Sequence, residues 1–194
     1  MLAIAPGPGM LYVLARSLVG GRREGALSAA GTFAGGLVHV VAAATGLSIV
    51  LATSATAFAI VKYVGAGYLI YLGARMIMSA GSDTDLPVLS NRARRNPLWQ
   101  GIATEVLNPK TAIFFLAFIP QFVDRVHGTA FWQFLLLGTV SVTLNTSADL
   151  IVVLLSHPIG SHLRASAVLR RRQRKATGLT LIGLGAYVAF ADTR

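Results

Sequence analysis

The chain contains no cysteine and few charged residues. The lack of cysteine excludes a disulfide framework, thiol redox chemistry and any metal site built on cysteine. Only 12% of the 194 residues are charged, whereas 54% are hydrophobic. A soluble domain of this length carries about twice that share of charged residues. The composition therefore indicates an integral membrane protein.

Six apolar stretches follow one another along the chain. A membrane-spanning helix needs about 20 apolar residues. Four stretches reach that length, the last is short, and the first is interrupted by proline and glycine. We therefore expect an all-α integral membrane protein, a six-helix bundle with a truncated first helix. The stretches cover residues 1–18, 27–51, 55–78, 98–118, 130–155 and 177–191.

The net charge of +10 would suggest nucleic-acid binding in a soluble protein. If the six helices alternate in direction, however, most basic residues fall in the connections on one side. Lysine and arginine beside spans are retained in the cytoplasm, so these loops are predicted to be cytoplasmic and both termini to lie outside. This topology, with contact to anionic membrane lipid, explains the charge without nucleic acid. The cytoplasmic side would carry Arg16, Arg22, Arg23, Arg75, Arg92, Arg94, Arg95, Arg164, Arg170, Arg171, Arg172, Arg174 and Lys175, and the opposite side Lys62, Arg125 and Arg194.

Two proline motifs interrupt the apolar stretches. Proline removes a backbone donor and clashes with the preceding turn, so each motif should open a helix. Broken backbone at membrane depth is tolerated where it is packed in protein or lines a watery cavity, and many transporters build their substrate sites in this way. The motifs predict a carrier whose substrate-binding residues include Pro6, Gly7 and Pro8 in the first half and Asn108, Pro109 and Lys110 in the second.

A polar connection divides the chain into two halves. Residues 81–96 form the longest basic, cytoplasmic loop and join halves at about 1–80 and 97–194. Each half has three helices, with a proline motif in the leading one, and an odd number of spans inverts the second half relative to the first. We predict a single membrane transport domain, residues 1–194, built from two inverted three-helix repeats.

Polar side chains inside the apolar stretches are candidates for transport. Lys110 would meet a substrate carboxylate, or else reach a lipid headgroup or pair with Glu105. Burial disfavours an ionised carboxyl, so Glu105 either exchanges a proton or forms a static pair with Lys110. Ser141, Asn145 and Asp149 recur every four residues and form one polar stripe. The stripe serves either transport, with Asn145 at the substrate and Asp149 as a second proton-coupling candidate, or hydrogen bonding between helices.

The histidines and serines do not form a pattern typical of an enzyme or a metal site. His39 either shuttles protons or packs and bonds a neighbour. His157 and His162 have too few carboxylates near them in the sequence for a metal site. The apolar segments contain neither a glycine–serine nucleophile motif nor a zinc-type histidine pair. We expect no enzymatic activity, no cofactor and no metal.

Several segments occur in the same order as in one known family. They are residues 6–8 with residues 10–16, residues 65–73, residues 107–112 and 114–122, and Gly178 with Gly183. This succession covers nearly the whole chain and resembles the LysE/RhtB family (lysine exporter, homoserine/threonine exporter) of bacterial inner-membrane amino-acid exporters. The resemblance implies a secondary transporter that exports amino acids or close derivatives. It also implies coupling to protons by antiport and transport by alternating access.

Two departures from the family pattern keep other functions open. The family has more apolar residues before the Pro-Gly-Pro motif than the five present here, and Glu105 stands where the family commonly has an uncharged polar residue. The alternatives are an inorganic-ion permease, or a membrane subunit without transport if the truncated first helix is genuine. Small-residue faces on the second and third helices would serve packing within one chain or in a homo-oligomer.

Overall fold

The computed structural model describes residues 7–47, 49–50, 54–79, 96–124, 129–156 and 167–190, nearly all of them in helices. The protein is therefore all-α in its described part, as the composition predicts. Pro6, residues 81–95 of the predicted connection, His157 and His162 lie outside the described residues, so the predictions that concern them stay predictions.

The first helix, α1 (Pro8–Ala42), is folded into a hairpin at Gly21. Gly21 has φ 74° and ψ −175°, a conformation that favours glycine over residues with a side chain. A Cβ on Gly9 would lie 3.6 Å from the Thr32 side chain, so the first arm (residues 8–20) runs back along the second arm (residues 22–42). The π-helix η2 (Ala43–Leu47) continues the second arm. The first two apolar stretches of the sequence thus contribute to the two arms of one hairpin.

The fourth apolar stretch is broken, as the Asn-Pro-Lys motif predicts. It forms α4 (Pro97–Val106), α5 (Pro109–Ile113), the π-helix η5 (Phe114–Phe118) and the 3-10 helix η6 (Ile119–Phe122). The chain bends by 46° between α4 and the helices that follow. A Cβ on Gly31 of α1 would lie 3.0 Å from the Gly101 Cα of α4, so the two backbones touch. This contact holds α4 against the second arm.

Helices α3 (Ala55–Met78) and α8 (Ala167–Phe190) pack closely against each other. A Cβ on Gly73 would lie 2.5 Å from the Gly178 carbonyl oxygen, and a Cβ on Gly185 would lie 2.7 Å from that of Ala66. Small residues allow this approach of two helix backbones. The small-residue faces on the second arm and on α3 therefore serve packing within one chain, apart from Gly67, whose Cβ position has no described atom within 4 Å.

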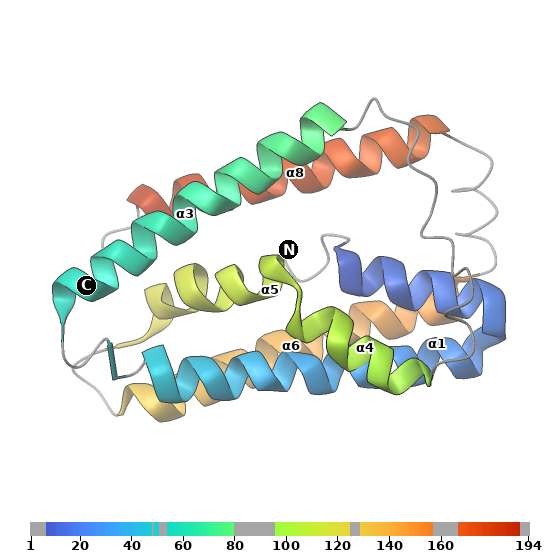
Figure 1. Ribbon diagram of the computed structural model, residues 1–194, viewed down its shortest axis with the longest axis horizontal. Helices are drawn as coiled ribbons and strands as arrows, with labels where there is room; N and C mark the ends of the chain where they lie inside the picture. Colours follow the sequence, from blue (N-terminus) through green and yellow to red (C-terminus); the bar gives the residue numbers. More distant parts are fainter. Residues whose placement is uncertain are drawn as a thin grey trace.

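The helices form two groups joined by the broken segment (Figure 1). One group is the α3–α8 pair, and the other contains α1, α4 and α6 (Ala130–Leu154). Phe115 of η5 belongs to an apolar cluster built mainly by α1, η2 and α6, to which α3 adds Phe58, whereas Ala117 of η5 belongs to the cluster of α3 and α8. The segment after the break thus packs against both groups.

By length and composition, three described stretches are long and apolar enough to cross a membrane: α1 with η2, taken together across the Gly21 turn, α3 and α6. The α4 pair with its bent continuation passes the same test, and residues Lys175–Phe190 of α8 form a shorter apolar helix. These lengths agree with an integral membrane protein. The count of six spans and the inverted repeat stay predictions.

Candidate functional site

The break in the fourth apolar stretch is made by Pro109 and capped by Asn108. Pro109 has no N–H, so the Glu105 carbonyl four residues earlier loses its helical donor. The Asn108 side-chain oxygen accepts from the Lys110 N–H at 3.1 Å and begins α5, while the Asn108 N–H turns back to the Glu105 carbonyl at 3.0 Å. The Asn-Pro-Lys motif thus ends one helix and starts the next.

His39 on the second arm supplies the donor that Pro109 lacks. Its Nε2 lies 3.0 Å from the Glu105 carbonyl oxygen, and its ring stacks on Phe115 with centroids 6.1 Å apart. A carbonyl only accepts hydrogen bonds, so Nε2 carries a hydrogen here. Of the two interpretations of His39, the structure supports packing and bonding to a neighbour.

The Glu105 carboxylate is buried at the break and held by two donors. The Thr111 hydroxyl donates to Oε1 at 2.6 Å, and the Asn108 amide nitrogen donates to Oε2 at 3.2 Å. The Glu105 side chain is 4% exposed. A Cβ on Gly9 of the first arm would lie 2.5 Å from Oε2, so a side chain at position 9 would force this carboxylate to move. Both arms of α1 therefore meet the break at Glu105.

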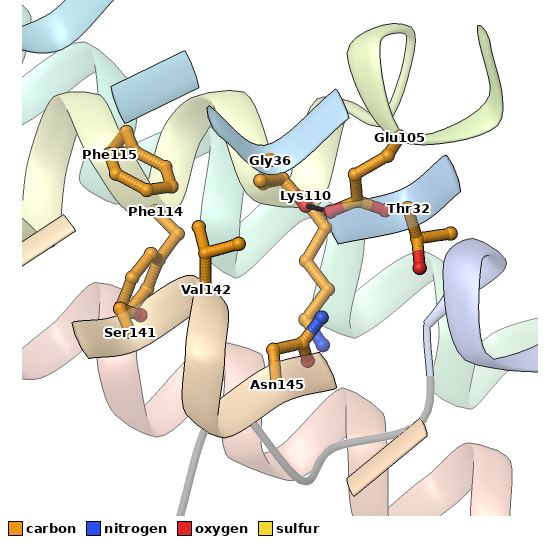
Figure 2. Close-up of a pocket in the computed structure, with 10 residues that line it drawn as sticks. Thr32, Gly36, Glu105, Lys110, Phe114, Phe115, Ser141, Val142 and Asn145 are labelled. Carbon is orange, nitrogen blue, oxygen red and sulfur yellow. Dashed lines mark hydrogen bonds between the residues drawn. The ribbon is translucent and has the colours of Figure 1, made fainter. Parts of the chain in front are cut away.

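A cavity of about 50 Å³ opens beside the break, large enough for a few water molecules. Figure 2 shows the Lys110 side chain extending along this cavity toward Asn145 of α6. Near the Pro-Gly-Pro motif, a Cβ on Gly7 would lie 3.2 Å from the Lys110 Cδ, so the two proline motifs meet at this lysine. Polar groups and aromatic rings share the wall, which is lined by Thr32, Gly36, Glu105, Lys110, Thr111, Phe114, Phe115, Ser141, Val142 and Asn145.

Asp149 lies behind the cavity wall and is fully buried. The Thr32 hydroxyl, which lines the cavity, is 3.1 Å from Asp149 Oδ2. Asp149 Oδ1 is buried and has no hydrogen-bond partner among the described residues. The carboxyl therefore reaches the cavity through the hydroxyl of a neighbouring helix, and not directly.

Arg16 lies within a helix and not in a loop, and its side chain is fully buried in the first arm. The side of the membrane predicted for it stays a prediction. Arg16 Nη1 lies 3.0 Å from Glu24 Oε2 across the Gly21 turn, and Nη2 donates to Gln100 of α4. The Tyr12 hydroxyl donates to the Pro97 carbonyl at 2.9 Å. These bonds tie the first arm to the start of α4.

The structure gathers most of the predicted site residues around the cavity and the break. Pro8 is the exception, because it is exposed at the first position of α1. Sequence reasoning did not identify Thr32 and Thr111, since hydroxyls are common in apolar helices and carry no distinctive signal. The predicted residues that meet here are Gly7, Glu105, Asn108, Pro109, Lys110 and Asn145, with Asp149 behind Thr32.

Comparisons with known proteins agree with the resemblance in the sequence. The family model described as LysE type translocator matches residues 1–192. An uncharacterized membrane protein of Pseudomonas aeruginosa is 34% identical over 193 residues, which cover 96% of this chain and 86% of the relative. An uncharacterized membrane protein of Vibrio cholerae is 28% identical over 98% of this chain and 92% of its own length.

A third relative is named for an activity. The homoserine/homoserine lactone efflux protein of Salmonella typhi is 30% identical over 192 residues, which cover 98% of this chain and 92% of the relative. No solved structure matches this chain. The family match over nearly the whole length, together with these relatives, identifies the chain as a member of the LysE type translocator family.

Proposed function

We propose that this protein is a secondary transporter that exports amino acids or close derivatives from the bacterial cytoplasm. The observation that carries the proposal is the cavity at the helix break, where a lysine and a carboxylate lie among apolar helices. Ionisable groups inside a membrane segment are costly and usually functional. The Salmonella typhi relative, named for efflux of homoserine and its lactone, supports the same substrate class.

The cavity wall suits a zwitterion with a small side chain. In our proposal the Lys110 ammonium binds the substrate carboxylate, and Asn145 hydrogen-bonds the amino group. Phe114 and Phe115 offer apolar surface to the substrate side chain. Asn108 and Pro109 maintain the break that opens the cavity, and Gly7 leaves room for Lys110. In the first half, Pro6 and Pro8 have the corresponding role of opening a helix.

Transport by alternating access would use the two halves of the domain. We propose that residues 1–80 and 97–194 form inverted three-helix repeats that rock against each other around the cavity. The contact between Gly7 and Lys110 supports this arrangement, because it brings the two proline motifs together. Export would be driven by proton antiport, with Glu105 and Asp149 as the two candidate proton carriers. The protein would lie in the inner membrane with its basic loops in the cytoplasm and both termini outside.

Efflux from bacterial cells that lack their own amino-acid exporters tests this proposal. Cells are preloaded with a panel of amino acids that includes homoserine, and efflux is followed with and without a proton gradient. We expect efflux of one chemical group that stops when the gradient is dissipated. Lys110→Met should abolish efflux, whereas the control Lys175→Met, at an exposed lysine of α8, should retain it. If a correctly inserted chain moves no member of the panel, the amino-acid proposal is wrong.

The break at Pro109 leads to a second prediction. Pro109→Ala gives residue 109 an N–H that can donate to the Glu105 carbonyl and extend α4 into α5. We expect near-complete loss of efflux with a normal amount of protein in the membrane. Pro97→Ala is the matched control, because Pro97 occupies the first turn of α4, where no helical donor is needed. Normal efflux from Pro109→Ala would show that the break is dispensable.

A further inference from the structure

The two buried carboxyl groups near the cavity differ in the hydrogen bonds that surround them. Glu105 accepts from the Asn108 amide on one oxygen and from the Thr111 hydroxyl on the other. An amide N–H₂ group can only donate, so it favours an acceptor on Glu105 Oε2. Two donors aimed at one carboxylate stabilise its ionised form. Both oxygens of Glu105 therefore have a hydrogen-bond donor.

Asp149 lies in surroundings that accept either protonation state. The Thr32 hydroxyl has one hydrogen but two acceptors within reach, Asp149 Oδ2 at 3.1 Å and the Ala29 carbonyl at 3.0 Å. When Asp149 is ionised, Thr32 donates to it. When Oδ2 carries a proton, that proton can bond the Thr32 oxygen while the Thr32 hydrogen turns to the Ala29 carbonyl. Both states keep Asp149 Oδ2 and the Thr32 hydroxyl hydrogen-bonded.

The second oxygen of Asp149 adds to this difference. Oδ1 is buried and has no hydrogen-bond partner within the described part of the chain. An unpartnered carboxylate oxygen in a buried site carries a desolvation cost, which is smaller when the group is neutral. The charged groups that act on Asp149 are Glu105 on α4 and Lys110 on α5, while α1 contributes the uncharged Thr32. Glu105 repels a negative charge at Asp149, and Lys110 attracts it. A substitution at either residue therefore changes the relative stability of the ionised and neutral forms of Asp149.

We propose that Asp149 binds the exchanged proton, that the Thr32 hydroxyl reverses its hydrogen bond as the proton comes and goes, and that Glu105 stays ionised. This assignment rests on the proposed function for its role in export. Thr32 lines the cavity and contacts Asp149, so it provides the route between them. The cavity that Lys110 lines then keeps a fixed negative charge on Glu105 throughout the cycle, while the charge of Asp149 changes.

Infrared spectroscopy of the purified full chain in lipid tests the assignment without any substrate. A protonated carboxyl shows a C=O stretching band that disappears when the group ionises, so the band is followed as the pH is raised. The other carboxyl groups titrate in every variant, so each variant is compared with the unsubstituted protein by difference spectra in which those groups cancel. We expect Asp149→Asn to remove a titrating band that Glu105→Gln retains. A band that Glu105→Gln removes and Asp149→Asn retains would overturn the proposal, and so would an Asp149→Asn spectrum in which no titrating band is lost.

Substitutions at Thr32 keep the test informative if Asp149→Asn does not fold. Thr32→Val removes the hydroxyl and should shift the frequency of the Asp149 band, because the hydrogen bond to Oδ2 is lost. Thr32→Ser keeps the hydroxyl and should leave the band in place. Identical bands in the unsubstituted protein and in Thr32→Val would contradict the proposed role of Thr32.

Efflux of homoserine from the same cells separates this proposal from the exporter proposal. If the unsubstituted chain exports homoserine, Asp149→Asn should flatten the dependence of efflux on pH, whereas Glu105→Gln should lose efflux at every pH tested. If Glu105→Gln flattens the profile instead, the proton assignment is wrong although export is established. If the chain exports nothing from the panel, the exporter proposal fails and the infrared band still decides which carboxyl takes the proton.

Discussion

At the scale of single residues, the site depends on groups that compensate for a missing backbone donor. Pro109 leaves the Glu105 carbonyl without its helical partner, and His39 and the Asn108 N–H replace that partner from two directions. His39 belongs to another helix, so it also fixes the break against the second arm of α1. The Nε2 hydrogen of His39 bonds the Glu105 carbonyl, and its ring stacks on Phe115. His39 therefore positions the break.

Substitution of His39 tests this positioning role. His39→Leu removes the donor but leaves the Asn108 N–H on the same carbonyl, so we expect a loss of about 1 kcal/mol in stability. His39→Gln places an amide N–H near the position of Nε2 and should retain most of that stability. Thermal unfolding of the purified protein measures both. A change in the pH profile of efflux in His39→Gln would indicate that the ring itself carries protons.

The sequence predicts some of these residues well and others not at all. The break at Asn108 and Pro109 follows from local chemistry, because a proline inside an apolar helix always removes a donor. The roles of Thr32 and His39 depend on which helices pack together, and a single sequence does not contain that information. Arg16 had a signal that sequence reasoning overlooked, since Glu24 follows it across a glycine-rich turn with the opposite charge.

At the scale of helices, glycine determines how closely the elements approach. The helices α3 and α8 touch through backbone atoms at Gly73 and Gly178, and α1 touches α4 at Gly31 and Gly101. The sequence predicted close packing for helix 3 from its small residues. It could not distinguish a glycine that faces another helix from one that faces outward, because both lie in the same apolar stretch.

Two glycines of α3 give a matched test of the α3–α8 contact. A Cβ on Gly73 would lie 2.5 Å from the Gly178 carbonyl oxygen, so Gly73→Ala must push two backbones apart and should cost about 1–3 kcal/mol. Gly67 is exposed, with no described atom within 4 Å of its Cβ position, and Gly67→Ala should be neutral or stabilising by up to about 1 kcal/mol. Thermal unfolding in detergent compares the two. Equal effects would show that the contact does not constrain the helices.

At the scale of the whole molecule, helix ends beside the predicted cytoplasmic loops lie together. Arg22, next to the Gly21 turn, donates to the Leu154 carbonyl at the end of α6, and the Tyr12 hydroxyl donates to the Pro97 carbonyl at the start of α4. The segment after η6 bonds the start of α6 through Asp124 and Gln133. The Gly21 turn thus lies beside the end of α6, while the alternation of spans with basic connections on one side stays a prediction.

The absence of cysteine makes the orientation easy to measure. Single cysteines are introduced at two exposed positions, Arg23→Cys beside the Gly21 turn and Asp124→Cys after η6. We expect a membrane-impermeant maleimide to label Asp124→Cys in intact spheroplasts and Arg23→Cys only after the membrane is opened. The unsubstituted chain provides a blank, since it has no thiol. The reverse labelling pattern would place the basic loops outside.

The ion pair across the Gly21 turn bears on how the chain enters the membrane during synthesis. A buried guanidinium is costly to place in lipid when it is alone. Arg16 and Glu24 belong to adjacent arms of one hairpin and lie close enough to pair as soon as the turn has formed. The Arg16–Glu24 pair can therefore leave the translocation channel without net charge before α4 is made, and Gln100 completes the hydrogen bonding of Arg16 when α4 arrives.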